Sequence, residues 1–174
     1  MDNIEPYMLI TKNRIDIVIG IEYVHYYENT LNTEFFVDLY IEHKRAFNGL
    51  VEKVYKGKDA HICRFNTLID SIKKREFNTI PVPIYKYNNE YWVIDGFHRS
   101  SIINYYKFPM NYTLEDTEKI TQGYYPTDIY FFKNKGYDLK YCNYTMQMFM
   151  KYYKKDFSCI VLFPNSKKLP DEYG

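Results

Sequence analysis

The sequence has few cysteines, and nothing in their spacing makes them act together. There are three, Cys63, Cys142 and Cys159, with no Cys-x-x-Cys pair and no metal-ligand spacing to any of the four histidines. An odd number of widely spaced cysteines excludes a disulfide framework and a zinc module of the usual spacing. We therefore expect reduced, structural thiols and a cytoplasmic protein.

The sequence also lacks a long apolar run and an excess of charge of either sign. The apolar stretch over 15–21 is short and charged at both ends, and Asp2 and Glu5 stand where a secretory signal would be basic, so we expect no membrane partner. Lys and Arg together number 23 against 22 Asp and Glu. This near-neutral charge disfavours nucleic acid as a partner, and the lack of clustered carboxylates disfavours a two-metal nuclease.

Apolar and aromatic residues, in contrast, are plentiful. With 174 residues, 46% of them hydrophobic, the chain can bury one sizeable core. No repeat or low-complexity tract divides it, so we expect a single domain over 1–174, with a helical N-terminal part (1–58), a motif core (59–112) and a C-terminal extension (113–174). A surface rich in the 21 tyrosines could support a homodimer.

Apolar spacing predicts a mixed α+β fold, a small sheet flanked by helices. The periodicity and the punctuating Gly, Pro and Asn residues predict helices over 13–27, 33–48, 63–75, 97–106 and 139–153, and strands over 82–87, 91–94, 124–132 and 160–163. Residues 53–59 are expected to form a charged connection, and residues 88–89 a tight turn, because Asn tolerates positive φ.

The clearest functional signal is Asp95-Gly96-Phe97-His98-Arg99, where a predicted strand runs into a predicted helix. Gly96 supplies the tight turn, and the backbone N–H groups of residues 97–100 would be donors at the positive helix end, with the Arg99 guanidinium beside them. A phosphate is the natural guest of such a site. A simpler alternative is that Asp95 merely caps the helix.

The segment 80–102, preceded by a predicted helix over 65–74, resembles the core of the ParB/sulfiredoxin-like superfamily, in which Asp-Gly-x-His-Arg forms a nucleotide site. The similarity covers about residues 60–110. A wider resemblance runs from Arg14-Ile-Asp16 through 39–43, 47–49 and Glu52, and is similar to ParB-like proteins of surface-glycan gene clusters. The resemblance implies a ParB/sulfiredoxin-like fold with an N-terminal helical extension.

Within the superfamily, individual residues separate the activities. Sulfiredoxin has its catalytic Cys between the Gly and the His of the motif, where this chain has Phe97, and a phenyl ring is not a nucleophile. Partition proteins add a helix-turn-helix domain and a basic face for DNA, which the composition does not indicate. The free serine kinases, which use an upstream carboxylate as base, are the most similar branch.

The resemblance therefore implies a kinase that uses ATP or ADP with Mg²⁺ and acts on a small hydroxyl-bearing acceptor such as a sugar or amino acid. The likeness to ParB-like proteins of surface-glycan gene clusters implies a place in glycan biosynthesis. Asp95 is expected to bind the metal or to orient the acceptor hydroxyl, and Glu52, or else Glu42, to act as base. A non-catalytic nucleotide switch that binds CTP or ATP is the main alternative, and a nuclease a weaker one. The expected nucleotide-binding residues are Gly96, Phe97, His98, Arg99, Ser100 and Ser101, and the expected acceptor-binding residues are Arg14, Asp16 and His43, although a surface ion pair would explain Arg14 and Asp16 equally well.

Overall fold

The structure is a computed structural model that describes residues 4–48, 57–74, 81–87, 89–116 and 126–153. These residues form a mixed α+β arrangement, six α-helices and a three-stranded sheet. In chain order the elements are a 3-10 helix η1 (Pro6–Leu9), α1 (Ile17–Asn29), α2 (Phe35–Asn48), α3 (Gly57–Lys73), β1 (Val82–Tyr87), β2 (Glu90–Val93), α4 (Phe97–Tyr106), β3 (Tyr112–Leu114), α5 (Ile129–Asn134) and α6 (Leu139–Tyr152).

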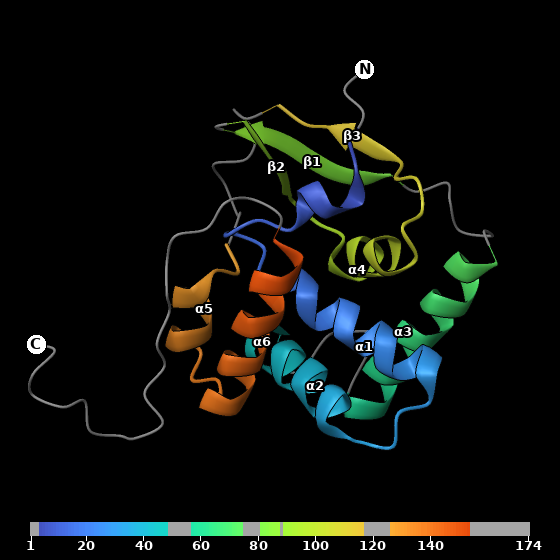
Figure 1. Ribbon diagram of the computed structural model, residues 1–174, viewed down its shortest axis with the longest axis vertical. Coiled ribbons are helices and arrows are strands. Elements are labelled where there is room, and N and C mark those ends of the chain that lie inside the picture. The colour runs from blue at the N-terminus through green and yellow to red at the C-terminus, as the bar shows by residue number, and fades with distance from the viewer. Residues whose placement is uncertain (1–3, 49–56, 75–80, 88, 117–125, 154–174) are drawn as a thin grey trace, which may run out of the picture.

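The small sheet lies at one end of the molecule, with α4 directly beneath it and the other helices beyond α4 (Figure 1). Its strand order is β2-β1-β3, with β2 antiparallel and β3 parallel to the central β1. Val82 and Ile84 alternate on one face of β1 and are fully buried together with Val93 of β2. The period of two therefore turns one apolar face of the sheet toward the core.

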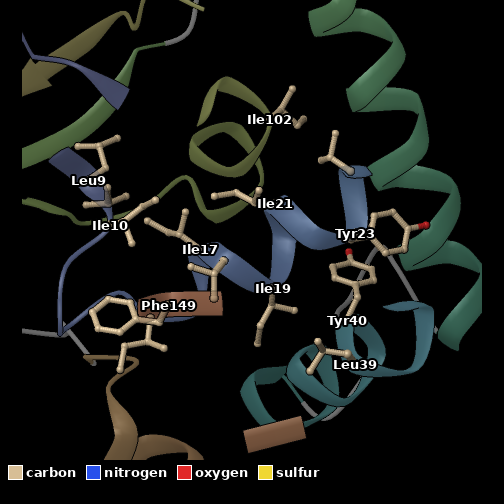
Figure 2. Packing of buried hydrophobic residues seen from close by; sticks show 14 of the residues in the cluster. Leu9, Ile10, Ile17, Ile19, Ile21, Tyr23, Leu39, Tyr40, Ile102 and Phe149 are labelled. Carbon is tan, nitrogen blue, oxygen red and sulfur yellow. The ribbon is translucent and has the colours of Figure 1, made fainter. Parts of the chain in front are cut away.

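Helix α1 is the centre of the helical part, because its residues from Ile17 through Val24 are all buried. Figure 2 shows Ile17, Ile19, Ile21 and Tyr23 of this helix surrounded by side chains of neighbouring helices, among them Leu39 and Tyr40 of α2, Ile102 of α4 and Phe149 of α6. A Cβ added at Gly20 would overlap Ser101 Oγ, so the glycine allows α1 and α4 to approach closely. A helix that is apolar nearly all round is buried on all sides, as observed.

Much of the local structure agrees with the sequence-based expectation. The bounds of β1 and α4 are as predicted, and α2 begins at Phe35, whose N–H donates to Thr33 Oγ1 at 3.3 Å. Asn89 has a φ of +60°, as expected of a tight turn. Among the described helices, none is both apolar enough and long enough to cross a membrane.

Other expectations are wrong. The predicted strand over 124–132 is replaced by α5, which begins after Asp128, whose side chain accepts from the Phe131 N–H at 2.9 Å. Helix α3 begins at Gly57, inside the expected connection, and the short strand β3 was not predicted. The strand predicted over 160–163 lies outside the described residues.

Candidate functional site

The turn between β2 and α4 is built around Gly96. Its φ of +113° and ψ of +31° lie in the left-handed region, which a residue with a Cβ rarely adopts. A Cβ there would also come within 3.3 Å of Val82 Cγ1 and 3.4 Å of Arg99 Nη2. The Asp95 Oδ1 atom accepts from the Gly96 N–H at 2.7 Å and closes the turn. The turn therefore requires glycine at this position.

Asp95 and Arg99 meet at the surface of this turn. Arg99 Nη1 donates to Pro81 O at 2.7 Å, and Arg99 Nη2 lies 4.0 Å from Asp95 Oδ2. The Asp95 side chain is 87% exposed, whereas that of Arg99 is 17% exposed. The Arg99 guanidinium is thus anchored to the residue that precedes β1, while the Asp95 carboxylate faces solvent.

The same turn forms the N-terminus of α4. No side-chain hydrogen bond from its N-cap residue, Gly96, caps the helix. The Ser100 N–H donates to Gly96 O at 2.8 Å, so this group is used within the helix and is not a ligand donor. Residues 97–99 precede that bond, where backbone N–H groups have no acceptor inside the helix. Asp95, Gly96 and Arg99 are therefore brought together at a positive helix end, as predicted.

His98 points away from this surface. Its Nε2 lies 2.9 Å from the Tyr40 hydroxyl, and its ring centroid is 4.5 Å from that of Phe65. Burial lowers the pKa of His98 well below its usual value, and the positive charges of Lys44 and Arg64 add to the effect. His98 is therefore a neutral, packed imidazole that supports α4 from beneath, and the structure does not bring it to the surface beside Arg99.

Ser100 and Ser101 also lie on the inner side of α4, and both are fully buried. Ser101 Oγ is within hydrogen-bond distance of Phe97 O (2.8 Å) and Ile17 O (3.1 Å), which holds α4 against α1. Phe97 is half-buried, with its ring centroid 4.8 Å from that of His43. Of the six expected nucleotide-binding residues, Arg99 is the one whose polar side chain lies next to the exposed Asp95.

The expected acceptor residues Arg14 and Asp16 form a buried ion pair. Arg14 Nε lies 2.9 Å from Asp16 Oδ1 and Arg14 Nη2 lies 3.0 Å from Asp16 Oδ2. The two residues are 6% and 1% exposed, so the surface ion pair considered from the sequence is not what forms. Burial alone would raise the pKa of Asp16, but the Arg14 guanidinium, with help from His43 and Thr127, holds it below its usual range.

His43 joins this pair from α2. Its Nδ1 lies 2.9 Å from the Tyr137 hydroxyl, its Nε2 lies 3.8 Å from Asp16 Oδ2, and burial lowers its pKa to about 4. Thr127 Oγ1 donates to Asp16 Oδ1. These five residues, Arg14, Asp16, His43, Thr127 and Tyr137, are here called the buried polar cluster. The three members that were expected to hold the acceptor come together, but all five side chains are buried.

Sequence reasoning missed Thr127 and Tyr137. They are 111 and 94 residues away from the side chains they bond, so no local pattern could have paired them with Asp16 and His43. The only local hint lay at Thr127-Asp128, a polar pair of the kind that precedes a helix.

The expected bases are less informative. Glu42 binds Arg45 through both carboxylate oxygens, with Arg45 Nε donating to Glu42 Oε2 at 2.8 Å. Glu52 lies outside the described residues. Within the described part of the chain, no group of three or more His, Cys, Asp or Glu side chains could hold a metal ion. A divalent cation at Asp95 would therefore depend on oxygens supplied by phosphates and water, as Mg²⁺ commonly does.

Comparison with known proteins found no matching family model, no similar curated protein and no similar solved structure.

Proposed function

We propose that the turn from Asp95 to Arg99 binds the phosphates of a nucleotide, ATP or ADP with Mg²⁺, and that the protein is a small-molecule kinase of ParB/sulfiredoxin-like fold. One observation carries the proposal. An exposed carboxylate, that of Asp95, and an anchored guanidinium, that of Arg99, meet at the N-terminus of the ten-residue helix α4. The N-cap of this helix is a glycine in the left-handed conformation, so no side chain caps the helix.

Three features of the turn favour a phosphate. The guanidinium of Arg99 is held in place through Nη1, so little side-chain entropy is lost when it binds an anion. Backbone N–H groups at the start of α4 add donors and a positive potential. Gly96 lacks the side chain that would keep a phosphate away from the backbone. The phosphate contact is thus assigned to Arg99 and the backbone, while His98, whose ring packs on Phe65, supports the helix.

Phosphoryl transfer needs charge neutralisation and an oriented acceptor more than covalent chemistry. Asp95 would be the protein ligand for Mg²⁺, and the ion would supply positive charge to offset the negative charge that develops during phosphoryl transfer. Asp95 would otherwise orient the hydroxyl of a sugar or amino acid acceptor. A carboxylate base completes the proposal, with Glu52 the first candidate and Glu42 the second.

A nucleotide switch of ParB type is the second candidate, and the state of Glu42 favours it. Arg45 donates to both oxygens of this carboxylate. Glu42 is the one predicted base that the described residues include, and it is already engaged in an ion pair. A switch requires only binding of CTP or ATP and a change of shape, and needs no base.

Calorimetric titration of ATP, ADP and CTP, with and without Mg²⁺, tests the proposal on the wild type and on Arg99→Ala. Because a charge-assisted hydrogen bond contributes about 1.5–3 kcal/mol, we expect affinity for ATP or ADP to fall about tenfold to a hundredfold in the variant. Arg45→Ala is the matched control, since it removes an exposed arginine from an ion pair on α2.

The outcomes separate the two candidates. Preference for CTP without turnover would favour the switch, and absence of nucleotide binding to the wild type would refute both. If Arg99→Ala lost its circular dichroism signal and its cooperative melting, Arg99 would be structural, through its bond to Pro81.

A further inference from the structure

The buried polar cluster contacts the proposed phosphate site on both sides of its turn. Before the turn, Arg14 Nη1 donates to the carbonyl oxygen of Val93, the last residue of β2, at 2.8 Å. After it, the His43 ring packs on Phe97, the first residue of α4, with 4.8 Å between ring centroids. The cluster thus contacts the two residues that flank the segment 94–96, which includes Asp95 and Gly96.

The pairing of β2 with β1 explains why Arg14 reaches Val93. The Ile94 N–H donates to Pro83 O at 2.9 Å, which makes Ile94 and Pro83 a hydrogen-bonded position of the antiparallel pair. The adjacent pair, Val93 and Ile84, is then a non-hydrogen-bonded position. The Val93 carbonyl consequently points to the side of β2 that carries no described strand, and the guanidinium of Arg14 occupies that side.

The remaining members hold Arg14 and His43 in place. Asp16 binds two nitrogens of Arg14, which directs the third, Nη1, at Val93. Thr127 supports Asp16 through its hydroxyl, and its backbone bonds Ile15 N and Asn13 O, at 3.2 and 2.9 Å.

His43 has a support of its own. The raised pKa of Tyr137 keeps its hydroxyl protonated, so the hydroxyl can donate to the neutral His43 at Nδ1. That bond directs Nε2 of His43 at Asp16. Thr127 and Tyr137 thus hold the cluster from the two sides of α5, one before the helix and one after it.

We propose that Thr127 and Tyr137 are positioning residues for the phosphate site, acting through Arg14 and His43 to fix the turn between Val93 and Phe97. This inference rests on the proposed function and replaces the expectation that Arg14, Asp16 and His43 hold the acceptor. A displacement of about 1 Å is enough to weaken a preorganised site substantially, so a lost hydroxyl far from the ligand should lower its affinity.

The test compares Tyr137→Phe with Tyr152→Phe. Each substitution removes one hydroxyl from a buried polar partner, since the Tyr152 hydroxyl donates to Glu22 Oε1 at 2.9 Å. We expect similar shifts in melting temperature for the two variants. Affinity for Mg²⁺-ATP should fall threefold to tenfold in Tyr137→Phe alone. Thr127→Val, which removes the hydroxyl bonded to Asp16, is the second variant and should lower affinity in the same direction.

Two further readouts distinguish positioning from general stability. Hydrogen exchange of the amides of residues 94–100 should speed up in Tyr137→Phe and stay unchanged in Tyr152→Phe, with no ligand present. The pH at which affinity declines on acidification should also rise in Tyr137→Phe, because His43 loses the hydroxyl that favours its neutral form.

The outcomes distinguish failure of the proposed function from failure of the positioning role. If the wild type bound no nucleotide but exchange at residues 94–100 responded as expected, the proposed function would fail while the coupling to the turn stood. If nucleotide bound and both tyrosine variants matched the wild type in affinity, exchange and pH profile, the positioning role would be overturned.

Discussion

The molecule contains two arginine–aspartate pairs in opposite surroundings. Arg14 Nε and Asp16 Oδ1 lie 2.9 Å apart in the core, where Arg14 also donates to Val93 O and Asp16 also accepts from Thr127. His43 Nε2 lies 3.8 Å from Asp16 Oδ2. Arg99 and Asp95 lie 4.0 Å apart at the start of α4, with the aspartate side chain 87% exposed. The protein itself completes the first pair, whereas the carboxylate of the second remains open to solvent.

The difference in burial suggests different roles for the two pairs. A buried pair that loses one partner leaves an uncompensated charge in the core, so its residues are tied to the fold. An exposed pair at 4.0 Å adds little to stability, so another cause is needed for a guanidinium and a carboxylate held at a helix N-terminus. We propose that a bound anion supplies that cause.

Replacing the buried arginine should give the largest effect. Arg14→Met leaves Asp16 charged and without its main partner, and we expect the free energy of unfolding to fall by about 3–5 kcal/mol in urea titration. Arg99→Met should cost only about 1 kcal/mol, for its bond to Pro81. Adding Asp16→Leu to Arg14→Met should recover part of the loss. Equal costs for Arg14→Met and Arg99→Met would abolish the distinction between the pairs.

Acid should weaken the buried polar cluster through the imidazole of His43. The pKa of His43 is about 4 in the folded protein against an ordinary value of 6.5, so below pH 6.5 the unfolded chain binds the proton more readily. Stability should therefore decline as the pH falls from about 6.5 to about 4, by a total on the order of 3 kcal/mol. His98, whose pKa is also lowered, acts in the same direction.

Urea titrations at pH 7.5, 5.5 and 4.5 measure this decline. In His43→Gln the slope between the first two values should be shallower, because one titrating group has been removed. A wild-type unfolding free energy that stayed constant from pH 7.5 to 4.5 would show that both imidazoles can be protonated inside the fold.

The smallest effect on stability is expected at Asp95. Asp95→Asn keeps an oxygen for the Gly96 N–H, so the free energy of unfolding should change by less than about 0.5 kcal/mol. The increase in ATP affinity caused by Mg²⁺ should nevertheless be lost. Asp138→Asn is the matched control, since Asp138 accepts from the Lys140 N–H at 2.9 Å at the start of α6. Unchanged Mg²⁺ dependence in Asp95→Asn would remove Asp95 from the site.

The exposed pair could be predicted from the sequence, and the completion of the buried one could not. Asp95, Gly96 and Arg99 lie within one turn of chain, where local rules for strand ends, glycine and helix starts apply directly. The direction of His98 depends on Tyr40 and Phe65, on two other helices, and no local rule reaches them. Helix α5 was missed because aromatic residues after Pro126 also favour strands, and the cap at Asp128 decided the outcome.

The central claim is that the exposed pair is kept for a phosphate ligand. Titration of Mg²⁺-ATP into wild type, Arg99→Ala and Arg45→Ala tests it most directly. The account predicts binding to the wild type and to Arg45→Ala, with affinity about tenfold to a hundredfold lower in a folded Arg99→Ala. Equal affinity in all three proteins, or no binding to the wild type, would contradict it.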